Sequence, residues 1–208
     1  MPLIIKSLLA CALLTSSAAA APRQTEPSPD TERREELKAR GAWSLTTYWA
    51  VMTPEKTGDA LLPPTELDTS FTFVAFALNR RLTTWFDKID IELEGQAVKH
   101  LGSQTHNEFN ALATGRWIRF PWNGYVATTV ALGGGASYAS EIPIFESITH
   151  ETTSQWLAYA LLEVTLAPPQ SSHWAFVFRA HHRSGANGTF GGVRGASDAL
   201  GLGIKFRW

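Results

Sequence analysis

The sequence predicts an all-β protein, an eight-stranded antiparallel transmembrane β-barrel behind a disordered N-terminal leader. Three observations predict this fold. From Ala42 onward, apolar and polar residues alternate with a period of two in eight successive segments. Most segments are longer than the five or six residues usual in globular strands, and several approach the ~9–11 residues that cross a bilayer at barrel tilt. Tryptophans gather at the predicted strand ends, where an interfacial aromatic girdle belongs.

The first twenty residues, 1–20, have the pattern of a secretory signal peptide. Lys6 supplies the positive charge, Ser7–Leu14 the short apolar core, and Ala18–Ala20 the small-residue cleavage pattern. A transmembrane anchor would need a longer apolar run. A lipoprotein cleavage box ending at Cys11 is a second alternative, although Lys6 interrupts its apolar stretch.

Residues 21–41 are expected to form a charged, flexible periplasmic leader. Residues 24–40 carry nine charged side chains and two prolines, with almost no apolar face. The formal net charge of the whole chain is −1, which excludes a basic nucleic-acid-binding domain. After Cys11 no cysteine follows, so disulfides do not stabilise the mature chain.

The barrel is expected to occupy residues 42–208. Its eight predicted strands are Trp43–Val51, Thr69–Arg80, Lys88–His100, Asn107–Arg119, Tyr125–Ala139, Thr153–Leu166, His173–His182 and Asp198–Trp208. Strand eight is expected to close on strand one, with Trp208 near the periplasmic rim. A soluble β-sandwich would alternate in the same way and is the competing interpretation.

The alternation in the late strands separates a lipid face from a lumen face. Even positions of His173–His182 are Trp, Phe, Phe, Ala and His, and even positions of the last strand are mostly Leu, Ile and aromatic residues. Because an arginine facing lipid at mid-height costs roughly 2–4 kcal/mol, the odd basic residues should face the lumen. These residues are Arg179, His181, Lys205 and Arg207, and their candidate partners are Glu92, Glu94 and Glu163.

The connections alternate in length, as outer-membrane barrels require. The short ones, expected in the periplasm, are Arg81–Asp87, Phe120–Gly124 and Ala167–Ser172. The long ones, expected outside, are Met52–Asp68, Ser140–Thr152 and Arg183–Ser197, with Leu101–His106 as a short exception. Six of the eight tryptophans fall at periplasmic strand ends or turns: Trp43, Trp85, Trp117, Trp122, Trp174 and Trp208.

The last residues, Leu202–Trp208, alternate in hydrophobicity and end in an aromatic side chain. This ending resembles the signal that outer-membrane assembly machinery reads, so that machinery is an expected partner. The expected location is the outer membrane of a Gram-negative-type bacterium.

An eight-stranded barrel is filled by its own side chains, so its function must come from the loops, the rim or the outer face. The candidate site lies in Phe178–Trp208, where His182-Arg183-Ser184 gives a His-x-Ser element near the outer end of strand seven. This hairpin and the barrel layout resemble the lipid A 3-O-deacylase family, also called acyloxyacyl hydrolases. The resemblance implies an esterase that removes an ester-linked acyl chain from lipid A or a related lipid of the outer leaflet.

The family resemblance and the alternation of side chains along the strands together predict a role for each candidate site residue. Ser184 is expected to be the nucleophile and His182 the general base, because a serine hydroxyl needs an imidazole to take its proton. Both share the even, lipid-facing parity of their strand. Gly185 and Asn187, in the glycine-rich turn that follows, are expected to bind the oxyanion or the substrate.

The chain departs from the family at the acid, which the family supplies as a glutamate on the next strand. Asp198 is the single carboxylate after Glu163, and it is the natural orienting acid. A distant Glu141, Glu146 or Glu151 could replace it, or the triad could be incomplete.

Two other interpretations of the sequence compete with the esterase. A non-enzymatic small barrel would serve in envelope structure, adhesion or small-ligand binding, and a soluble sandwich would bind lipid in the periplasm. No cofactor and no metal is expected, because no second cluster of metal ligands accompanies His181 in the sequence.

Overall fold

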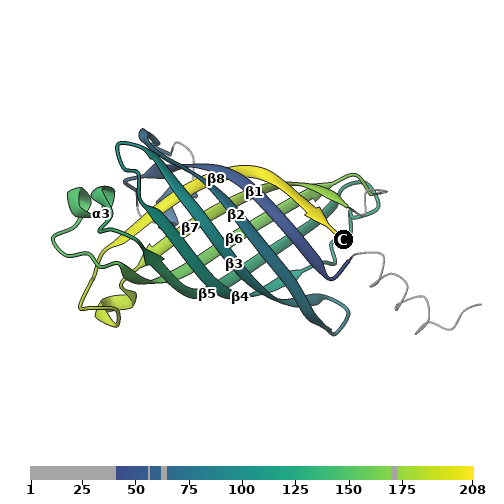
Figure 1. Ribbon diagram of the computed structural model, residues 1–208. Coiled ribbons are helices and arrows are strands. Elements are labelled where there is room, and N and C mark those ends of the chain that lie inside the picture. Colours follow the sequence, from purple (N-terminus) through teal and green to yellow (C-terminus); the bar gives the residue numbers. More distant parts are fainter. Residues whose placement is uncertain (1–40, 56, 62–64, 170–172) are drawn as a thin grey trace, which may run out of the picture.

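A computed structural model describes residues 41–55, 57–61, 65–169 and 173–208. Eight antiparallel strands form one closed barrel in sequence order (Figure 1). The strands are β1 (Trp43–Thr53), β2 (Asp68–Trp85), β3 (Ile89–Gly102), β4 (Asn107–Trp117), β5 (Ala127–Ala139), β6 (Trp156–Ala167), β7 (Trp174–Ser184) and β8 (Ala196–Arg207). The predicted signal peptide and nearly all of the leader lie outside the described residues.

The barrel closes between its first and last strands, as predicted. Ser44 pairs with Arg207, and the register runs without interruption to Thr53 opposite Asp198. At the rim, Trp43 and Trp208 exchange two backbone hydrogen bonds, of 3.1 and 3.0 Å. The competing two-sheet sandwich is therefore wrong for the described chain.

The two ends of the barrel differ. The terminal end carries Gly41, Trp208 and the connections after β2, β4 and β6. The loop end carries three short helical segments, which are α2 (Thr57–Ala60), α3 (Ile144–Thr149) and the 3-10 turn η1 (Ala186–Gly188) (Figure 1). No helix in the described part of the chain is long and apolar enough to cross a membrane.

Several strands are longer than predicted, and two of the differences have clear causes. β2 continues past Arg80 because a register shift between Arg81 and Thr83 lets it pair again with β3. Its hairpin then turns at Phe86 and Asp87, whose φ angles of 51° and 56° match the twist of a two-residue hairpin. At the loop end, β7 and β8 extend to Ser184 and from Ala196, which places His182, Ser184 and Asp198 inside the sheet, whereas Gly185 and Asn187 lie in the connection.

The outer surface of the barrel is apolar. Alternate strand residues expose large hydrophobic side chains, among them Leu78, Phe109, Leu132, Phe176 and Leu202. A belt of this extent in water would be a large exposed apolar patch, whereas in a bilayer it is the surface that lipid covers. The six tryptophans assigned to the periplasmic side all lie at the terminal end, each at least 38% exposed.

The interior is filled with paired charges toward the terminal end. Arg179 bonds both Glu94 and Glu163, and Lys205 bonds Glu163 from the opposite side. Arg116 reaches Glu92 at 3.0 Å and Glu163 at 2.8 Å. The predicted lumen positions of Arg179 and Lys205 are confirmed, and Arg207 likewise turns inward, to the hydroxyl of Thr165. His181 is also buried in the lumen, where it contacts Glu108, an acid that was not among the predicted partners.

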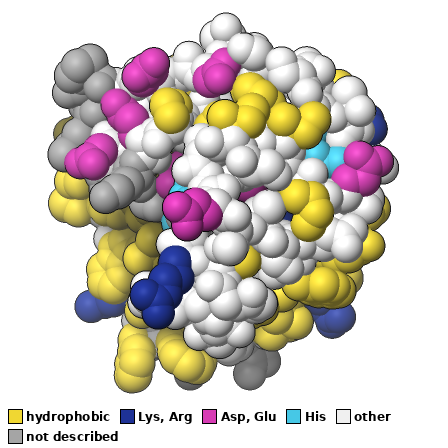
Figure 2. Space-filling model, turned by 90° about the vertical axis from the view of Figure 1, so that its left-hand side faces the viewer, with side chains coloured by type: hydrophobic (Ala, Val, Ile, Leu, Met, Phe, Trp, Pro, Cys, Tyr) yellow, Lys and Arg dark blue, Asp and Glu magenta, His cyan; other side chains and the backbone are white. Residues whose placement is uncertain are grey.

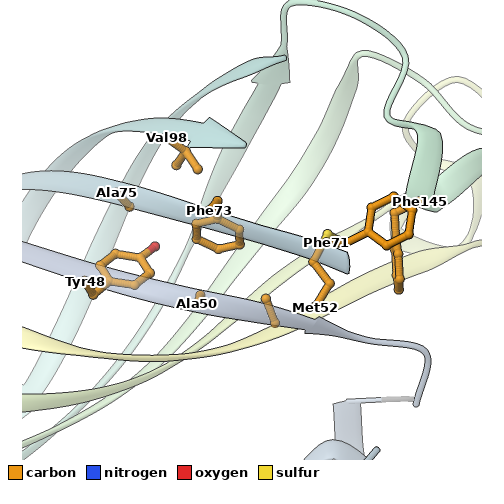
Figure 3. Close-up of a cluster of buried hydrophobic side chains, with 9 residues drawn as sticks. Tyr48, Ala50, Met52, Phe71, Phe73, Ala75, Val98 and Phe145 are labelled. Carbon is orange, nitrogen blue, oxygen red and sulfur yellow. The ribbon is translucent and has the colours of Figure 1, made fainter. Parts of the chain in front are cut away.

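Toward the loop end, apolar and aromatic side chains join the polar groups of the interior. Figure 3 shows Tyr48 and Phe73 side by side within the barrel, with Phe71 and Met52 nearer the rim. Phe145, from α3, reaches down onto Phe71 at 5.1 Å between ring centres. The segment containing α3 is therefore anchored in the mouth of the barrel.

Candidate active site

The candidate site is built by the outer ends of β7 and β8. His182 and Asp198 are direct cross-strand partners in the ladder, and Ser184 pairs with Ala196 one step nearer the rim. Residues two apart on a strand share a face, so His182 and Ser184 point to the same side of the sheet. That side is the outer one, because Arg183, between them, is buried in the lumen.

His182 and Asp198 form a close polar pair. The Nδ1 atom of His182 lies 2.9 Å from Oδ1 of Asp198. The His182 side chain is 20% exposed, whereas that of Asp198 is 6% exposed, and α2 lies against β8 at this end. A carboxylate on Nδ1 fixes the tautomer and leaves Nε2 as the base, which is the role expected of the orienting acid.

Ser184 lies on the same face, two residues from His182, and is partly exposed. Among the described residues, its hydroxyl makes no side-chain hydrogen bond to His182 or Asp198. The structure thus brings together the predicted base and acid and leaves the predicted nucleophile adjacent. Catalytic hydrogen bonds often tighten only when substrate binds.

Of the three alternative acids, Glu146 takes a different role. From α3 its carboxylate enters the barrel mouth and accepts hydrogen bonds from Arg183 and from Ser197 at 2.9 Å. Arg183 lies between His182 and Ser184, and Ser197 precedes Asp198. Glu146 therefore ties together the lumen side of the two strands whose outer side carries the site. Glu141 and Glu151 are exposed loop residues.

The two predicted oxyanion residues differ in their surroundings. The N–H of Gly185 already donates to the carbonyl of Gly195 at 3.1 Å, so it is not a free donor in this conformation. A Cβ at this position would lie 1.9 Å from the carbonyl oxygen of Val193, so only glycine fits this close to the neighbouring backbone. Asn187 is exposed in η1 with a φ of 56°, and its amide remains the candidate donor.

A second cluster, which the sequence did not reveal, lies in the lumen at the same end. His100 and His181 contact the two oxygens of Glu108, each at 3.0 Å, and the ring of His106 stacks on His100. The sequence does contain a signal for part of this cluster. His100, His106 and Glu108 all have even positions around the short connection between β3 and β4, which places them on the same face of this hairpin. Their meeting with His181, however, needs the barrel to close.

The comparisons with known proteins support the fold. No protein-family model matches the chain, and no curated protein matches it significantly. The solved structure of the outer-membrane enzyme PagL is similar, with a TM-score of 0.55 and 10% sequence identity, covering 79% of this chain and 99% of PagL. The outer-membrane protein OprG from Pseudomonas aeruginosa also matches, at a TM-score of 0.39 and 12% identity, over 80% of this chain and 95% of OprG.

The likeness to PagL shows the fold alone, an eight-stranded barrel of the outer-membrane kind. The likeness to OprG is too distant to carry an argument. The chemistry of the site therefore rests on the geometry of its own residues.

Proposed function

We propose that this protein is an outer-membrane esterase that removes an ester-linked acyl chain from lipid A or a related lipid. Ser184 is the nucleophile, His182 the general base and Asp198 the orienting acid. The observation that carries the proposal is the pair between His182 Nδ1 and Asp198 Oδ1 at 2.9 Å, beside a serine on the same outward face. The similarity in fold to PagL, an outer-membrane enzyme, agrees with a catalytic barrel.

The proposed chemistry follows from these positions. Ser184 Oγ attacks the ester carbonyl while Nε2 of His182 takes the hydroxyl proton, and Asp198 stabilises the imidazolium through Nδ1. The protonated His182 then donates to the departing alcohol oxygen. Water, activated by the same imidazole, hydrolyses the acyl-enzyme and releases the fatty acid.

The position of the site suits a lipid substrate. His182 and Ser184 continue the outward row of Trp174, Phe176 and Phe178, which are all exposed on the apolar belt. A substrate held in the outer leaflet would present its ester near the loop end, at the height of these residues. A water-soluble ester would need no such placement, so the location of the site supports a lipid substrate.

Mass spectrometry of lipid A tests the proposal. Purified protein refolded in detergent should remove one acyl chain from lipid A, and cells carrying the protein should contain lipid A lighter by the same mass. Ser184→Ala should abolish the product while the barrel remains folded. Ser103→Ala, a change of an exposed loop serine, should retain activity. Acyl release by Ser184→Ala at the wild-type rate would rule out this site.

A non-enzymatic barrel that binds a small ligand is the second candidate, favoured by a different observation. At the terminal end, a cavity of about 340 Å³ is lined by basic side chains that include Arg81, Arg119 and Arg207, together with Asp90 and Glu92. Its size is that of a small ligand site. Unchanged lipid A masses in the experiment above would favour this candidate.

A further inference from the structure

The buried carboxylate of Glu108 differs from the other buried glutamates of the lumen. Each of the others bonds an arginine or lysine directly, as the pairs of Arg116 with Glu92, Arg179 with Glu94 and Glu163, and Arg183 with Glu146 illustrate.

Glu108 is fully buried, and the groups in direct contact with its carboxylate are the amide of Asn110, at 2.8 Å, and the imidazoles of His100 and His181, each at 3.0 Å. None of these groups carries a fixed positive charge. The nearest guanidinium atom among the described residues, Nε of Arg183, lies 3.8 Å away and belongs to a group already paired with Glu146. Because a buried charge requires a countercharge, either an imidazolium or a cation must balance Glu108.

The environment of His106 favours the cation. Its Nε2 atom is buried and has no hydrogen-bond partner in the described structure, and the residue is 4% exposed. A buried nitrogen without a partner is costly unless something occupies it.

The positions of these side chains fit a single ion. His100, His106 and Glu108 each offer one ligand atom, and these atoms all lie within 4.8 Å of one another. We propose that His100, His106 and Glu108 form a binding site for one divalent transition-metal ion of the Zn²⁺ type inside the loop end of the barrel. Two imidazoles and one carboxylate are a zinc ligand set that leaves a fourth position for water or a further side chain.

The surroundings supply the remaining requirements of such a site. The side-chain amide nitrogen of Gln104 lies 2.9 Å from Nδ1 of His100 and holds this ring in place. A cavity of about 10 Å³ borders Glu108, His100 and His181, which is roughly the space of one water. His181 contacts the second oxygen of Glu108 at 3.0 Å and so helps to orient the carboxylate.

The loop end also has the charge that attracts cations. Figure 2 looks onto this face and shows acidic side chains distributed across it. Asp59, Glu66, Glu141 and Glu151 are all exposed in the loops here. Basic side chains such as the exposed Arg194 also lie at this end, but the excess of acidic side chains raises the local concentration of cations, so a metal would approach His106 from this side.

The test is a zinc titration of the refolded, tag-free barrel after removal of metal with EDTA. Isothermal calorimetry should show one Zn²⁺ per chain, and Mg²⁺ should not compete, because it prefers oxygen ligands. His106→Ala should weaken Zn²⁺ binding at least about tenfold. The matched controls His150→Ala, at the same end, and His173→Ala, at the other, should bind as the wild type does.

A spectroscopic measurement on the wild-type protein needs no variant. Substitution with Co²⁺ should produce the visible d–d absorption of a tetrahedral ion, and X-ray absorption at the zinc edge should show imidazole scattering. Absence of stoichiometric Zn²⁺ binding, absence of imidazole scattering, or equal affinity in His106→Ala and His150→Ala would each overturn the proposal. Lipid A hydrolysis plays no part in these readouts, so this proposal stands or falls separately from the esterase.

Discussion

At the scale of single residues, the pair of His182 with Asp198 is the feature on which the proposed chemistry depends. The resemblance in sequence calls for a glutamate on the strand after His-x-Ser, and this chain has an aspartate there. Its shorter side chain still reaches His182 Nδ1 at 2.9 Å, because the two residues are direct partners across the β7–β8 ladder. Direct pairing makes the additional methylene of a glutamate unnecessary.

Asp198→Asn tests that role. The variant preserves the size of the side chain but removes the charge and can hold the wrong tautomer of His182. We expect kcat to fall at least about 100-fold, whereas loss of Ser184 or His182 removes nearly all activity. Steady-state kinetics on a chromogenic short-chain ester in detergent measures the effect. Wild-type kcat in Asp198→Asn would remove this residue from the triad.

Glu163 is the residue on which the lumen charges converge. It bonds Arg179, Lys205 and Arg116, and it is fully buried. Glu163→Gln leaves these cations with one counter-ion fewer, and breaking a buried pair in this way costs about 3–5 kcal/mol. The midpoint of urea unfolding in lipid vesicles should fall accordingly. Glu151→Gln, in an exposed loop, should leave the midpoint unchanged, and equal midpoints for both variants would contradict the role of the network.

At the scale of elements, α3 and the β7–β8 hairpin act together. The segment of α3 places Phe145 in the mouth of the barrel and extends Glu146 to Arg183 and Ser197. Arg183 and Ser197 point into the lumen, and they alternate along β7 and β8 with the outward-facing site residues. The loop thus holds the sheet from inside at the point where the reaction is proposed on its outer side.

Glu146→Gln tests this positioning role. The amide retains the shape but loses the ion pair with Arg183, so we expect kcat to fall roughly tenfold with KM nearly unchanged, since Glu146 does not touch the substrate. The same ester assay measures both constants, and Glu141→Gln is the matched control. An unaltered kcat, or a change confined to KM, would show that Glu146 only stabilises the fold.

At the scale of the whole molecule, side chains block the lumen beyond the cavity at its terminal end. Paired charges cross the barrel next to this cavity, and Tyr48, Tyr159 and Phe73 fill the next layer, each at most 2% exposed. Gly201 and Gly203 make room for Tyr48, because a Cβ on either would lie within 2.7 Å of its atoms. The barrel is therefore expected to be a scaffold and not a channel, as its strand number also suggests.

Planar-bilayer recording measures this directly. The reconstituted protein should give no steady conductance under conditions in which a porin opens stable channels. Steady ohmic current through the wild-type barrel would mean that the ion network of the lumen opens in the membrane. Heat-dependent migration on gels should accompany the recording as the check that the protein is folded.

The sequence by itself determined the fold and the two faces of the barrel. Alternation with period two, carried by residues such as Phe176, Arg179 and Lys205, depends only on strand geometry, so it can be interpreted without knowledge of any partner strand. His182, Ser184 and Asp198 could be placed on one side and at one end for the same reason.

Only the tertiary structure decided which residues meet. The pairing of His182 with Asp198 required the register of β7 against β8, which extends farther than the hydrophobic pattern shows. The contact of Glu146 with Arg183 required a loop to fold into the barrel mouth. The gathering of His100, His106 and Glu108 near His181 required closure, because β3 and β7 face each other only across a finished lumen. The distance between side chains on different strands depends on how the barrel closes, so a local sequence pattern does not predict it.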